Sequence, residues 1–451
     1  MHFAQYYLDC LSQASYLIGD TTTGRAVIVD PRRDVGDYLS DAQAAGLSIE
    51  LIIETHFHAD FLSGHLELAE ATGAEIGFSS VADTEFDSRK LADGERISLG
   101  EVELEIRHTP GHTPESISVV VWEKAGDDEP WGVLTGDTLF IGDVGRPDLL
   151  SAVGHSREDL ASQLYDSVHE KLMTLPDSTR LWPGHGAGSA CGKNLSTDTS
   201  STIGEQRVGN EAVLAPNRDA FIELITTGQP VAPAYFSYDA MLNRQERGLL
   251  DESNPPLLLD EAAAGAAVAE GAILLDTRSP EEFAAGHMPG SINVGLAGRY
   301  AEFAGSVIPT DADIVIVANP DQIAESRTRL ARIGFDRVIG AVANPTPWMT
   351  QTAERLTADE YAADDRPVQL VDVRNPGELA DGVIDGAITI PVMQLPARLG
   401  ELDPDRRTVV YCAGGYRSSV AASLLRKAGF GEVADIDGGW GAWTARAGAA
   451  V

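Results

Sequence analysis

The sequence predicts a multidomain α/β protein, and three observations support this prediction. Patterns typical of strands and of helices alternate along most of the 451 residues, as they do in layered α/β folds. Several of the predicted strands end in loops that carry His or Asp. A pattern around Asp276 returns around Asp372, which indicates two copies of one domain. A chain of this length is expected to form about three domains, each with its own core.

The composition is that of an ordinary folded protein, with 43% hydrophobic and 23% charged residues. No apolar run approaches the ~18 residues that a membrane-spanning helix needs, and the first residues lack a signal-peptide pattern. We therefore expect a cytoplasmic protein without membrane contact. The formal charge of −36 disfavours nucleic acid as a partner. Adaptation to high salt and a plainly acidic mesophilic surface both agree with this charge.

Three cysteines, Cys10, Cys191 and Cys412, lie far apart in the chain and form no CxxC pair. A disulfide framework and a structural zinc site are therefore not expected. Any thiol with a function in this protein is expected to act singly.

The N-terminal half alternates between apolar patterns of period two and helical patterns that end at glycine or proline. The predicted strands are residues 6–18, 25–30, 49–53, 75–78, 96–99, 102–108, 116–121, 131–134 and 179–182. The predicted helices are residues 34–45, 64–72, 155–175, 210–228 and 238–248. A turn-rich linker at 251–256 is expected to end this part of the chain.

Four strands of this half end in loops that carry possible metal ligands. The loop residues are His56, His58, Asp60, His112, Asp137 and His185. Each one taken alone is also an ordinary residue of a solvated turn. Four such loops in order at strand ends indicate a site on one rim of an α/β fold, and His and Asp are common metal ligands.

The order HxHxD, GHT, GDT and GH resembles the metallo-β-lactamase superfamily, whose fold is a four-layer αββα sandwich. Within that superfamily, residues 1 to about 240 resemble the persulfide dioxygenases. The stretches that carry the resemblance are 54–65 (ETHFHADFLSGH), 109–113 (TPGHT), 134–145, 168–175 (VHEKLMTL), 184–192 and 204–207. Glyoxalase II-like thioesterases share this frame and provide the alternative.

The resemblance to the dioxygenases implies one Fe(II) per chain, held by His56, His112 and Asp137. Two His and one carboxylate leave positions open for substrate sulfur and O₂. Hydrolytic relatives hold two zinc ions, and their second ion uses a His at the position of Phe61. Because phenylalanine has no lone pair, two zinc ions about 3.5–4 Å apart are not expected. Some of the resembled dioxygenases keep a His here, so Phe61 argues against zinc without proving iron.

With one metal ion, the other polar loop residues are expected to orient the ligands and to hold water. These residues are His58, Asp60 and His185. Cys191 follows shortly after and either faces the same cavity as a substrate-binding residue or is a buried inert thiol. Arg146 either pairs with a substrate carboxylate or forms a structural ion pair with Asp148.

Beyond the linker, both copies of the repeat resemble rhodanese domains. Residues 273–282 (ILLDTRSPEE) return as 370–378 (LVDVRNPGE), and each copy continues with a predicted strand that leads to a loop. We therefore expect domains at 1–245, 258–350 and 355–451. The first copy has residues 315–320 (VIVANP) where the second has its cysteine, so the first is expected to be an inactive structural or docking module.

Cys412 is the predicted nucleophile of the second copy. It begins the loop CAGGYR between a predicted strand at 409–411 and a predicted helix at 420–428. A loop at a helix N-terminus directs backbone N–H groups to its centre, which stabilises a thiolate and the persulfide that it would carry. Arg417 adds positive charge for an anionic sulfur donor such as thiosulfate.

Over its full length the chain resembles persulfide dioxygenase–rhodanese fusions. The resemblance implies oxidation of a glutathione, coenzyme A or similar persulfide with O₂ to thiol and sulfite, in sulfide and persulfide detoxification. Cys412 would then form or consume thiosulfate, and fusion would keep the intermediates at high local concentration. The alternatives are a dinuclear zinc thioesterase with sulfurtransferase domains and a sulfur-carrier or docking protein. We also expect a homo-oligomer.

Overall fold

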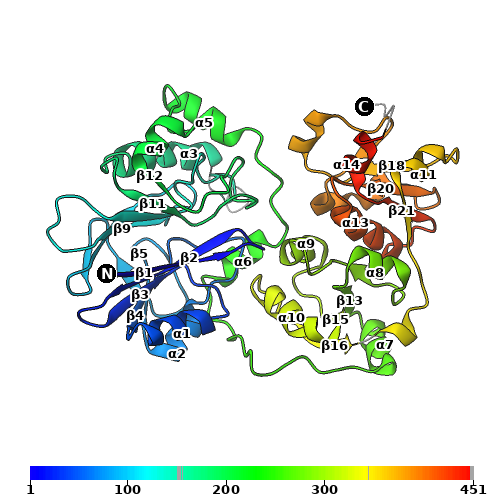
Figure 1. Ribbon diagram of the computed structural model, residues 1–451, viewed down its shortest axis with the longest axis horizontal. Coiled ribbons are helices and arrows are strands. Elements are labelled where there is room, and N and C mark those ends of the chain that lie inside the picture. The colour runs from blue at the N-terminus through cyan, green and yellow to red at the C-terminus, as the bar shows by residue number, and fades with distance from the viewer. Residues whose placement is uncertain (150–153, 155, 344, 447–451) are drawn as a thin grey trace. The chain divides into compact units, whose positions relative to one another are not determined.

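The computed structural model describes residues 1–149, 154, 156–343 and 345–446, which form two compact units (Figure 1). Unit 1 consists of Met1–Ala232 and Phe236–Leu250. Unit 2 consists of Pro233–Tyr235 and Asp251–Val451. No helix in the described part of the chain is both long enough and apolar enough to cross a membrane.

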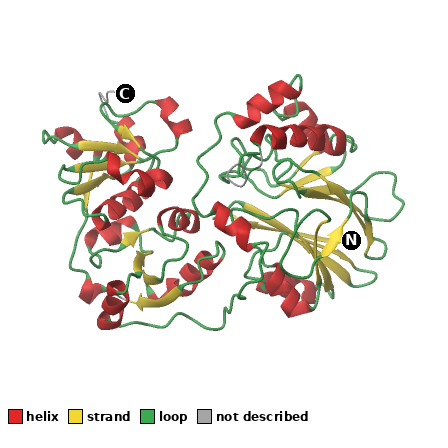
Figure 2. Cartoon of the chain, turned by 180° about the vertical axis from the view of Figure 1, so that it is seen from behind, coloured by secondary structure: helices red, strands yellow, loops and turns green. Residues whose placement is uncertain are grey.

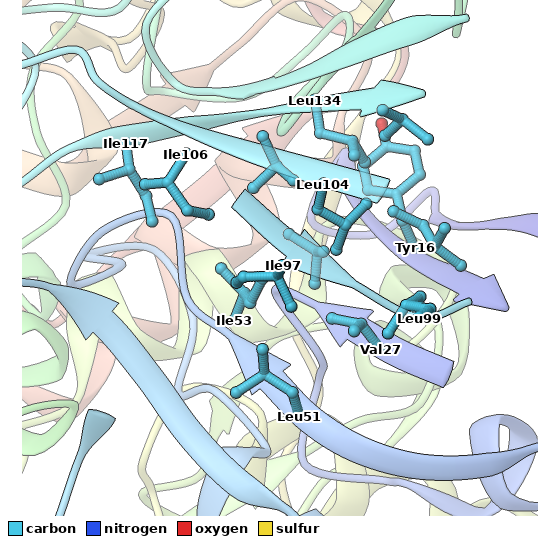
Figure 3. Close-up of a cluster of buried hydrophobic side chains, with 14 of the residues drawn as sticks. Tyr16, Val27, Leu51, Ile53, Ile97, Leu99, Leu104, Ile106, Ile117 and Leu134 are labelled. Atoms are coloured by element: carbon cyan, nitrogen blue, oxygen red, sulfur yellow. The ribbon is translucent and has the colours of Figure 1, made fainter. Parts of the chain in front are cut away.

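Unit 1 contains two six-stranded sheets with a common core. The first sheet has the order β1-β2-β3-β4-β5-β6, and the second has the order β12-β11-β10-β9-β8-β7. The strands of the first sheet are β1 (His2–Leu8), β2 (Gln13–Asp20), β3 (Arg25–Val29), β4 (Ser48–Ile53), β5 (Glu75–Ser79) and β6 (Arg89–Leu91). Those of the second are β7 (Arg96–Ser98), β8 (Glu103–His108), β9 (Ile117–Trp122), β10 (Gly132–Gly136), β11 (Arg180–Pro183) and β12 (Ser201–Thr202). Apolar side chains from both sheets, including Tyr16, Ile53 and Leu104, are buried between them (Figure 3).

Helices cover the outer faces of the two sheets, which confirms the four-layer αββα fold. Tyr38 and Leu68 pack two helices on the first sheet, and Leu164 and Phe221 pack two others on the second. The helices of unit 1 are α1 (Gly36–Ala44), α2 (His65–Thr72), α3 (Arg157–Asp166), the π-helix Ser167–Leu172, α4 (Ile203–Gly209), α5 (Arg218–Thr226) and α6 (Phe236–Leu242).

The strand predicted at 6–18 is in fact the antiparallel hairpin of β1 and β2. Tyr7 pairs with Ala14 in this hairpin, and Ser12 in the turn has a positive φ of 54°. A continuous apolar pattern does not reveal such a turn, because the half-buried β1 and the buried β2 both carry apolar residues up to it.

Three helix predictions were too long. The helix predicted at 238–248 ends at Leu242 in α6. The helix predicted at 210–228 is shorter in the structure, because α5 starts only after Pro216, where the side chain of Asn217 accepts a hydrogen bond from the backbone N–H of Ala220. Of the helix predicted at 155–175, the first residue lies outside the described residues, and the remainder becomes α3 and the π-helix.

Unit 2 contains two sheets of parallel strands, one for each repeat. The first has the order β14-β13-β15-β16 and the second β17-β21-β20-β18-β19. The strands are β13 (Ile273–Asp276), β14 (Ile292–Asn293), β15 (Ile314–Ala318), β16 (Val338–Ala343), β17 (Glu354–Leu356), β18 (Gln369–Asp372), β19 (Ile388–Thr389), β20 (Thr408–Tyr411) and β21 (Val433–Ile436). Buried apolar strands of this kind are typical of sheets covered by helices on both faces. Figure 2 shows helices packed around the strands of this unit.

The two repeats share the same Arg–Asp ion pair at the end of a central strand. Arg278 Nε donates to Asp276 Oδ1 at 3.0 Å, and Arg374 Nε donates to Asp372 Oδ1 at the same distance. The helices are α7 (Glu261–Ala269), α8 (Pro280–Ala285), α9 (Tyr300–Val307), α10 (Ile323–Ala331), α11 (Ala358–Ala363), α12 (Leu395–Arg398), α13 (Tyr416–Lys427) and α14 (Gly439–Thr444). The helix predicted at 420–428 begins four residues earlier, so it starts directly behind the cysteine loop.

Candidate metal centre and thiol site

His56, His112 and Asp137 meet at one rim of unit 1. His56 follows β4 of the first sheet, whereas His112 and Asp137 follow β8 and β10 of the second. One donor atom of each lies within 4.8 Å of the others. The distance to Asp137 Oδ2 is 3.9 Å from His56 Nε2 and 3.6 Å from His112 Nε2. All three side chains are buried, so the folded sandwich holds them in place.

Hydrogen bonds behind the two rings select the nitrogen that faces the cluster. His112 Nδ1 lies 2.9 Å from the carbonyl oxygen of Arg146, so Nδ1 carries the proton. His56 Nδ1 lies 2.9 Å from Thr55 Oγ1, and that hydroxyl donates its proton to Asp30 Oδ2 at 2.8 Å. His56 Nδ1 must therefore donate as well. Both rings present the Nε2 lone pair to Asp137, as metal-binding histidines do.

The charge state of the cluster suits a divalent metal ion. Burial lowers the pKa of His56 and of His112, so both rings are neutral. Burial opposes the charge of Asp137, but the charge of His185 and its hydrogen bond outweigh it and hold the pKa of Asp137 below its usual range. Among the described residues, His56 Nε2 and Asp137 Oδ2 are buried and have no hydrogen-bond partner. Each such orphan costs about 1–3 kcal/mol, and a bound ion would satisfy both.

His185 joins the second oxygen of Asp137 to Asp60. His185 Nδ1 donates to Asp137 Oδ1 at 2.7 Å, and Nε2 lies 2.6 Å from Asp60 Oδ2. Burial favours the neutral ring, but Asp137 and Asp60 outweigh it and raise the pKa of His185 well above its ordinary value. A doubly protonated His185 thus holds Asp137 with Oδ2 turned toward the histidines. The supporting role of His185 and Asp60 stays a prediction.

His58 points away from this cluster, toward Asp30 and Glu54. Its Nε2 lies 3.1 Å from Asp30 Oδ1 and 3.5 Å from Glu54 Oε2. Burial lowers the pKa of His58, but Asp30 and Glu54 together raise it to about 10. His58 is therefore a buried cation whose partner Asp30 also accepts from Thr55. Through Thr55 it supports the orientation of His56.

Sequence reasoning missed Asp30 and Asn243, which hold the loop that carries His56 and His58. Asp30, at the end of β3, accepts hydrogen bonds from the backbone and side chain of Thr55. The amide of Asn243 donates to the carbonyl oxygens of His58 at 2.8 Å and Phe61 at 2.9 Å. Asp30 stands at a strand end, which is a usable signal. Asn243 has no signal in the sequence, because its partners are remote in the chain.

Phe61 is buried and fills the space beside His58. The two ring centroids are 4.3 Å apart. The apolar ring thus stands where a sixth ligand of the loop motif would be, and it contributes no donor atom. Cys191 Sγ, however, lies with donor atoms of Asp60 and His185, all within 4.8 Å of one another. Burial, followed by the charges of Asp60 and Asp137, raises the pKa of Cys191 well above its ordinary value, so the thiol is protonated.

Arg146 is engaged by the protein itself. Its Nε and Nη2 donate to the two carboxylate oxygens of Asp148 at 2.7 and 2.8 Å, and Nη1 donates to the carbonyl oxygen of Ala190. This is the structural ion pair that the sequence left open. A substrate carboxylate would have to displace Asp148, and substrate binding by Arg146 stays a prediction.

Cys412 lies at the end of β20, in front of the first turn of α13. The backbone N–H of Gly415 donates to Cys412 Sγ at 3.1 Å. Gly415 has a φ of +96°, which brings its N–H into this position and favours glycine. Arg417 donates through Nη1 and Nη2 to both oxygens of Glu378, each at 2.6 Å. The thiol is buried at the N-terminus of a helix, where negative charge on sulfur is stabilised.

Comparisons with known proteins agree with this architecture. The model of the metallo-beta-lactamase superfamily matches residues 8–185, and the model of the rhodanese-like domain matches residues 258–342 and 357–446. The crystal structure of a metallo-beta-lactamase from Staphylococcus aureus is 33% identical, with a TM-score of 0.70, and covers 76% of this chain and 99% of that chain.

Among curated proteins, the mitochondrial persulfide dioxygenase ETHE1 of Bos taurus is 32% identical over 200 residues, which are 44% of this chain and 69% of that protein. A hydroxyacylglutathione hydrolase of Rhodospirillum rubrum is 33% identical over 172 residues, 38% of this chain and 60% of that protein. The αββα fold and its strand-end His/Asp cluster define a metallo-β-lactamase domain. The chain belongs to the metallo-beta-lactamase superfamily, with persulfide dioxygenases of the ETHE1 type among its homologues and a C-terminal pair of rhodanese-like domains.

Proposed function

We propose that unit 1 is an iron-dependent dioxygenase that oxidises the persulfide of a small thiol. The observation that carries this proposal is the donor set of two neutral histidines and one carboxylate with unpartnered atoms facing one another. Such a set suits non-haem iron and leaves positions open for ligands. The likeness to ETHE1 supports iron and a persulfide substrate. The overall reaction is RSSH + O₂ + H₂O → RSH + H₂SO₃.

In this proposal His56, His112 and Asp137 hold one Fe(II), which supplies the activation of O₂ and a binding position for anionic sulfur. The other residues act on this donor set. Thr55 and the carbonyl oxygen of Arg146 keep the proton of each ring on Nδ1. His185 fixes Asp137 by a hydrogen bond to Oδ1. The buried walls exclude bulk water, which keeps these contacts strong.

We propose that the second rhodanese-like domain transfers sulfane sulfur through Cys412. The Gly415 N–H and the N-terminus of α13 stabilise the thiolate and its persulfide. With thiosulfate as donor, the thiolate attacks the sulfane sulfur and sulfite leaves with the electron pair of the broken S–S bond. The reverse reaction forms thiosulfate from enzyme persulfide and sulfite. Either direction fits a role in sulfide and persulfide detoxification.

An oxygen electrode and metal quantification on the same sample test the dioxygenase proposal. We expect about one iron per chain and O₂ uptake with glutathione persulfide or coenzyme A persulfide. Iron-loaded protein that consumes no O₂ with either persulfide would favour the sulfur-carrier or docking alternative. Two zinc ions per chain would overturn the proposal.

One observation favours a second candidate, a dinuclear hydrolase. Asp60, His185 and Cys191 place three donor atoms within 4.8 Å of one another, so the Cys191 sulfur, once a metal ion displaces its proton, offers the ligand that Phe61 lacks. The likeness to a hydroxyacylglutathione hydrolase points the same way. Under the dioxygenase proposal Cys191→Ser leaves one iron per chain. Loss of a second metal ion in this variant, with hydrolysis of a hydroxyacylglutathione by the unmodified chain, would establish the hydrolase.

We also propose the domain boundaries 1–245, 258–350 and 355–451, which the ranges matched by the rhodanese-like model support. The first rhodanese-like domain has Asn319-Pro320 after its central strand, where the second has Cys412. It therefore carries no persulfide at this position. A cytoplasmic location and a homo-oligomeric state remain predictions from the sequence.

A further inference from the structure

The rhodanese-like repeat without the cysteine lines the cavity of Cys412. This cavity has a volume of about 540 Å³. The second repeat contributes Cys412, Tyr416 and Arg417 to its walls, and the first repeat contributes Arg299 and Phe303. The sulfurtransferase site is therefore built from both repeats.

The contact between the repeats is close and specific. The hydroxyl of Tyr416 donates to the carbonyl oxygen of Gly295 at 2.6 Å, and the hydroxyl of Ser419 donates to Asn293 Oδ1 at 2.8 Å. A Cβ atom at Gly298 would lie 2.5 Å from the Tyr416 ring, so the backbone of the first repeat touches this ring. Since α13 starts directly after the Cys412 loop, these contacts hold Arg299 at a set place beside the thiol.

The two arginines of the cavity differ in which partner of their ion pair is accessible. Arg417 is bound by both oxygens of Glu378, and its side chain is 15% exposed against 35% for the glutamate. Arg299, the N-cap residue of α9, pairs with Glu302, but here the arginine is 36% exposed and the glutamate 5%. The cation is thus the more exposed partner of the pair in the first repeat, whereas the carboxylate is the more exposed partner in the second.

We propose that Arg299 recognises the sulfur oxyanion that reacts at Cys412. The ligand is the sulfonate end of thiosulfate or, in the reverse direction, sulfite. A guanidinium has five N–H donors, and Glu302 occupies only part of them, so Arg299 has donors left for an oxyanion. The first repeat, although it lacks a cysteine, then decides which substrates the second repeat accepts.

This inference rests on the proposed sulfurtransferase activity of Cys412, and its chemistry is that of the transfer step. The Cys412 thiolate forms a bond to the sulfane sulfur of thiosulfate, the S–SO₃ bond breaks, and sulfite leaves with its electron pair. Three negative charges are present before and after the step. Arg299 holds the leaving sulfonate, so its main effect falls on thiosulfate binding.

Steady-state kinetics of the full-length chain with thiosulfate as donor and cyanide as acceptor test the proposal. We expect Arg299→Gln to raise KM for thiosulfate about tenfold or more, which is the loss expected for one charged hydrogen bond, with a smaller change in kcat. Arg299→Lys keeps the charge but loses the planar guanidinium, so its KM for thiosulfate should lie between those of the wild type and Arg299→Gln. Arg337→Gln is the matched control, because Arg337 lies in the same repeat in an exposed ion pair with Asp313.

An unchanged KM in Arg299→Gln, equal to that of Arg337→Gln, would overturn the proposal. Where thermal unfolding shows that Arg299→Gln is not folded, Arg299→Lys decides, and an unchanged KM there overturns it. Failure of the proposed sulfurtransferase function gives a different result. In that case the unmodified chain shows no turnover of thiosulfate, or the Cys412→Ser variant still turns thiosulfate over. In that event calorimetric thiosulfate binding decides for Arg299: weaker binding by Arg299→Gln supports its role, and equal binding excludes it.

Discussion

At the scale of single residues, the metal cluster depends on groups that never touch the metal position. Asp30 accepts the Thr55 proton, Thr55 accepts the His56 proton, and the carbonyl of Arg146 accepts the His112 proton. Because Thr55 and the Arg146 carbonyl accept from Nδ1, the Nε2 atom of each ring keeps its lone pair. These hydrogen bonds behind the rings therefore fix the orientation of the two histidines.

Thr55→Val tests the hydrogen bond behind His56 without a change in side-chain shape. Loss of the hydroxyl removes the acceptor for His56 Nδ1–H, and we expect the affinity for Fe(II) to fall roughly 10–100-fold. Competition with a chelator under anaerobic conditions measures it. Thr174→Val is the control, because Thr174 is on the surface and its hydroxyl donates to the Lys171 carbonyl and accepts from Arg107, away from the cluster. Equal iron affinity in the two variants would contradict the role of Thr55.

At the scale of elements, buried ion pairs and special backbone conformations hold the functional loops. α2, which follows the His56 loop, is fixed by Glu67, which accepts from Arg33 Nε at 2.9 Å and from Arg247 Nη1 at 2.7 Å. The loop at Cys412 needs the positive φ of Gly415. Glu67 thus joins α2 to Arg33 and Arg247, and Gly415 joins the Cys412 loop to α13.

The pair of arginines around Glu67 predicts a pH-dependent stability. Burial opposes the charge of Glu67, but Arg247 and Arg33 outweigh it and lower its pKa to about 2. A lowered pKa means that the stabilisation is complete above about pH 4.5, the unfolded value, and is lost as the pH falls toward 2. We expect Glu67→Gln to lower the free energy of unfolding by about 2–3 kcal/mol at pH 7.

Urea unfolding of the wild type and of Glu67→Gln at pH 7 and pH 3 measures this effect. The difference should narrow at pH 3, because the unfolded wild-type chain then binds a proton at Glu67, whereas the folded carboxylate, with its pKa of about 2, stays ionised. Glu70→Gln on the exposed face of the same helix is the control. A difference that stays constant between the two pH values would show that the charge of Glu67 is not the cause.

Gly415→Ala tests the backbone of the thiol loop. At a φ of +96° a side chain costs about 1–2 kcal/mol, and the new Cβ would lie 3.1 Å from Arg355 Nη2. We expect the Gly415 N–H to move from Cys412 Sγ, and alkylation of the thiol at neutral pH to slow several-fold, because the thiolate loses a donor. Gly431→Ala, at an open position of the same repeat, should leave the rate unchanged. Equal alkylation rates in Gly415→Ala and Gly431→Ala would refute the role of the Gly415 N–H.

At the scale of the whole molecule, the two candidate sites lie in separate units. The His/Asp cluster lies wholly in unit 1, and the Cys412 cavity lies wholly in unit 2. Sulfite is a product of the first proposed reaction and a substrate or product of the second. Connection in one chain keeps the local concentration of such an intermediate high.

Two substitutions test whether the activities are independent. Asp137→Ala removes a ligand, so O₂ uptake with a persulfide should be abolished while thiosulfate sulfurtransferase activity remains. Cys412→Ser should have the opposite effect. Each variant is the control for the other in an oxygen electrode and a thiosulfate–cyanide assay. Loss of both activities from either single substitution would mean that the units are not functionally separate.

The sequence by itself determined the classes of structure. Strand-end His and Asp residues, the Asp-x-Arg repeat and the alternation of apolar patterns are local features, and they predicted a layered α/β fold and two copies of one domain. The resemblance of these motifs to known families implied the αββα sandwich and the two rhodanese-like domains, which the comparisons confirm. Strand ends gave six candidate ligands, and the resemblance to the dioxygenases selected His56, His112 and Asp137 among them. The structure brings them within reach of one another.

Only the tertiary structure decided which other groups serve the two sites. Asp30 and Asn243 hold the metal loop, Cys191 faces Asp60 and His185, and Arg299 joins the Cys412 cavity from another repeat. Asp30 at a strand end and Cys191 shortly after His185 have local signals, but Asn243 and Arg299 have none, because their partners are remote along the chain and belong to different elements. Local spacing encodes strands, helices and motifs, whereas side-chain partners depend on how the packed layers bring distant loops together.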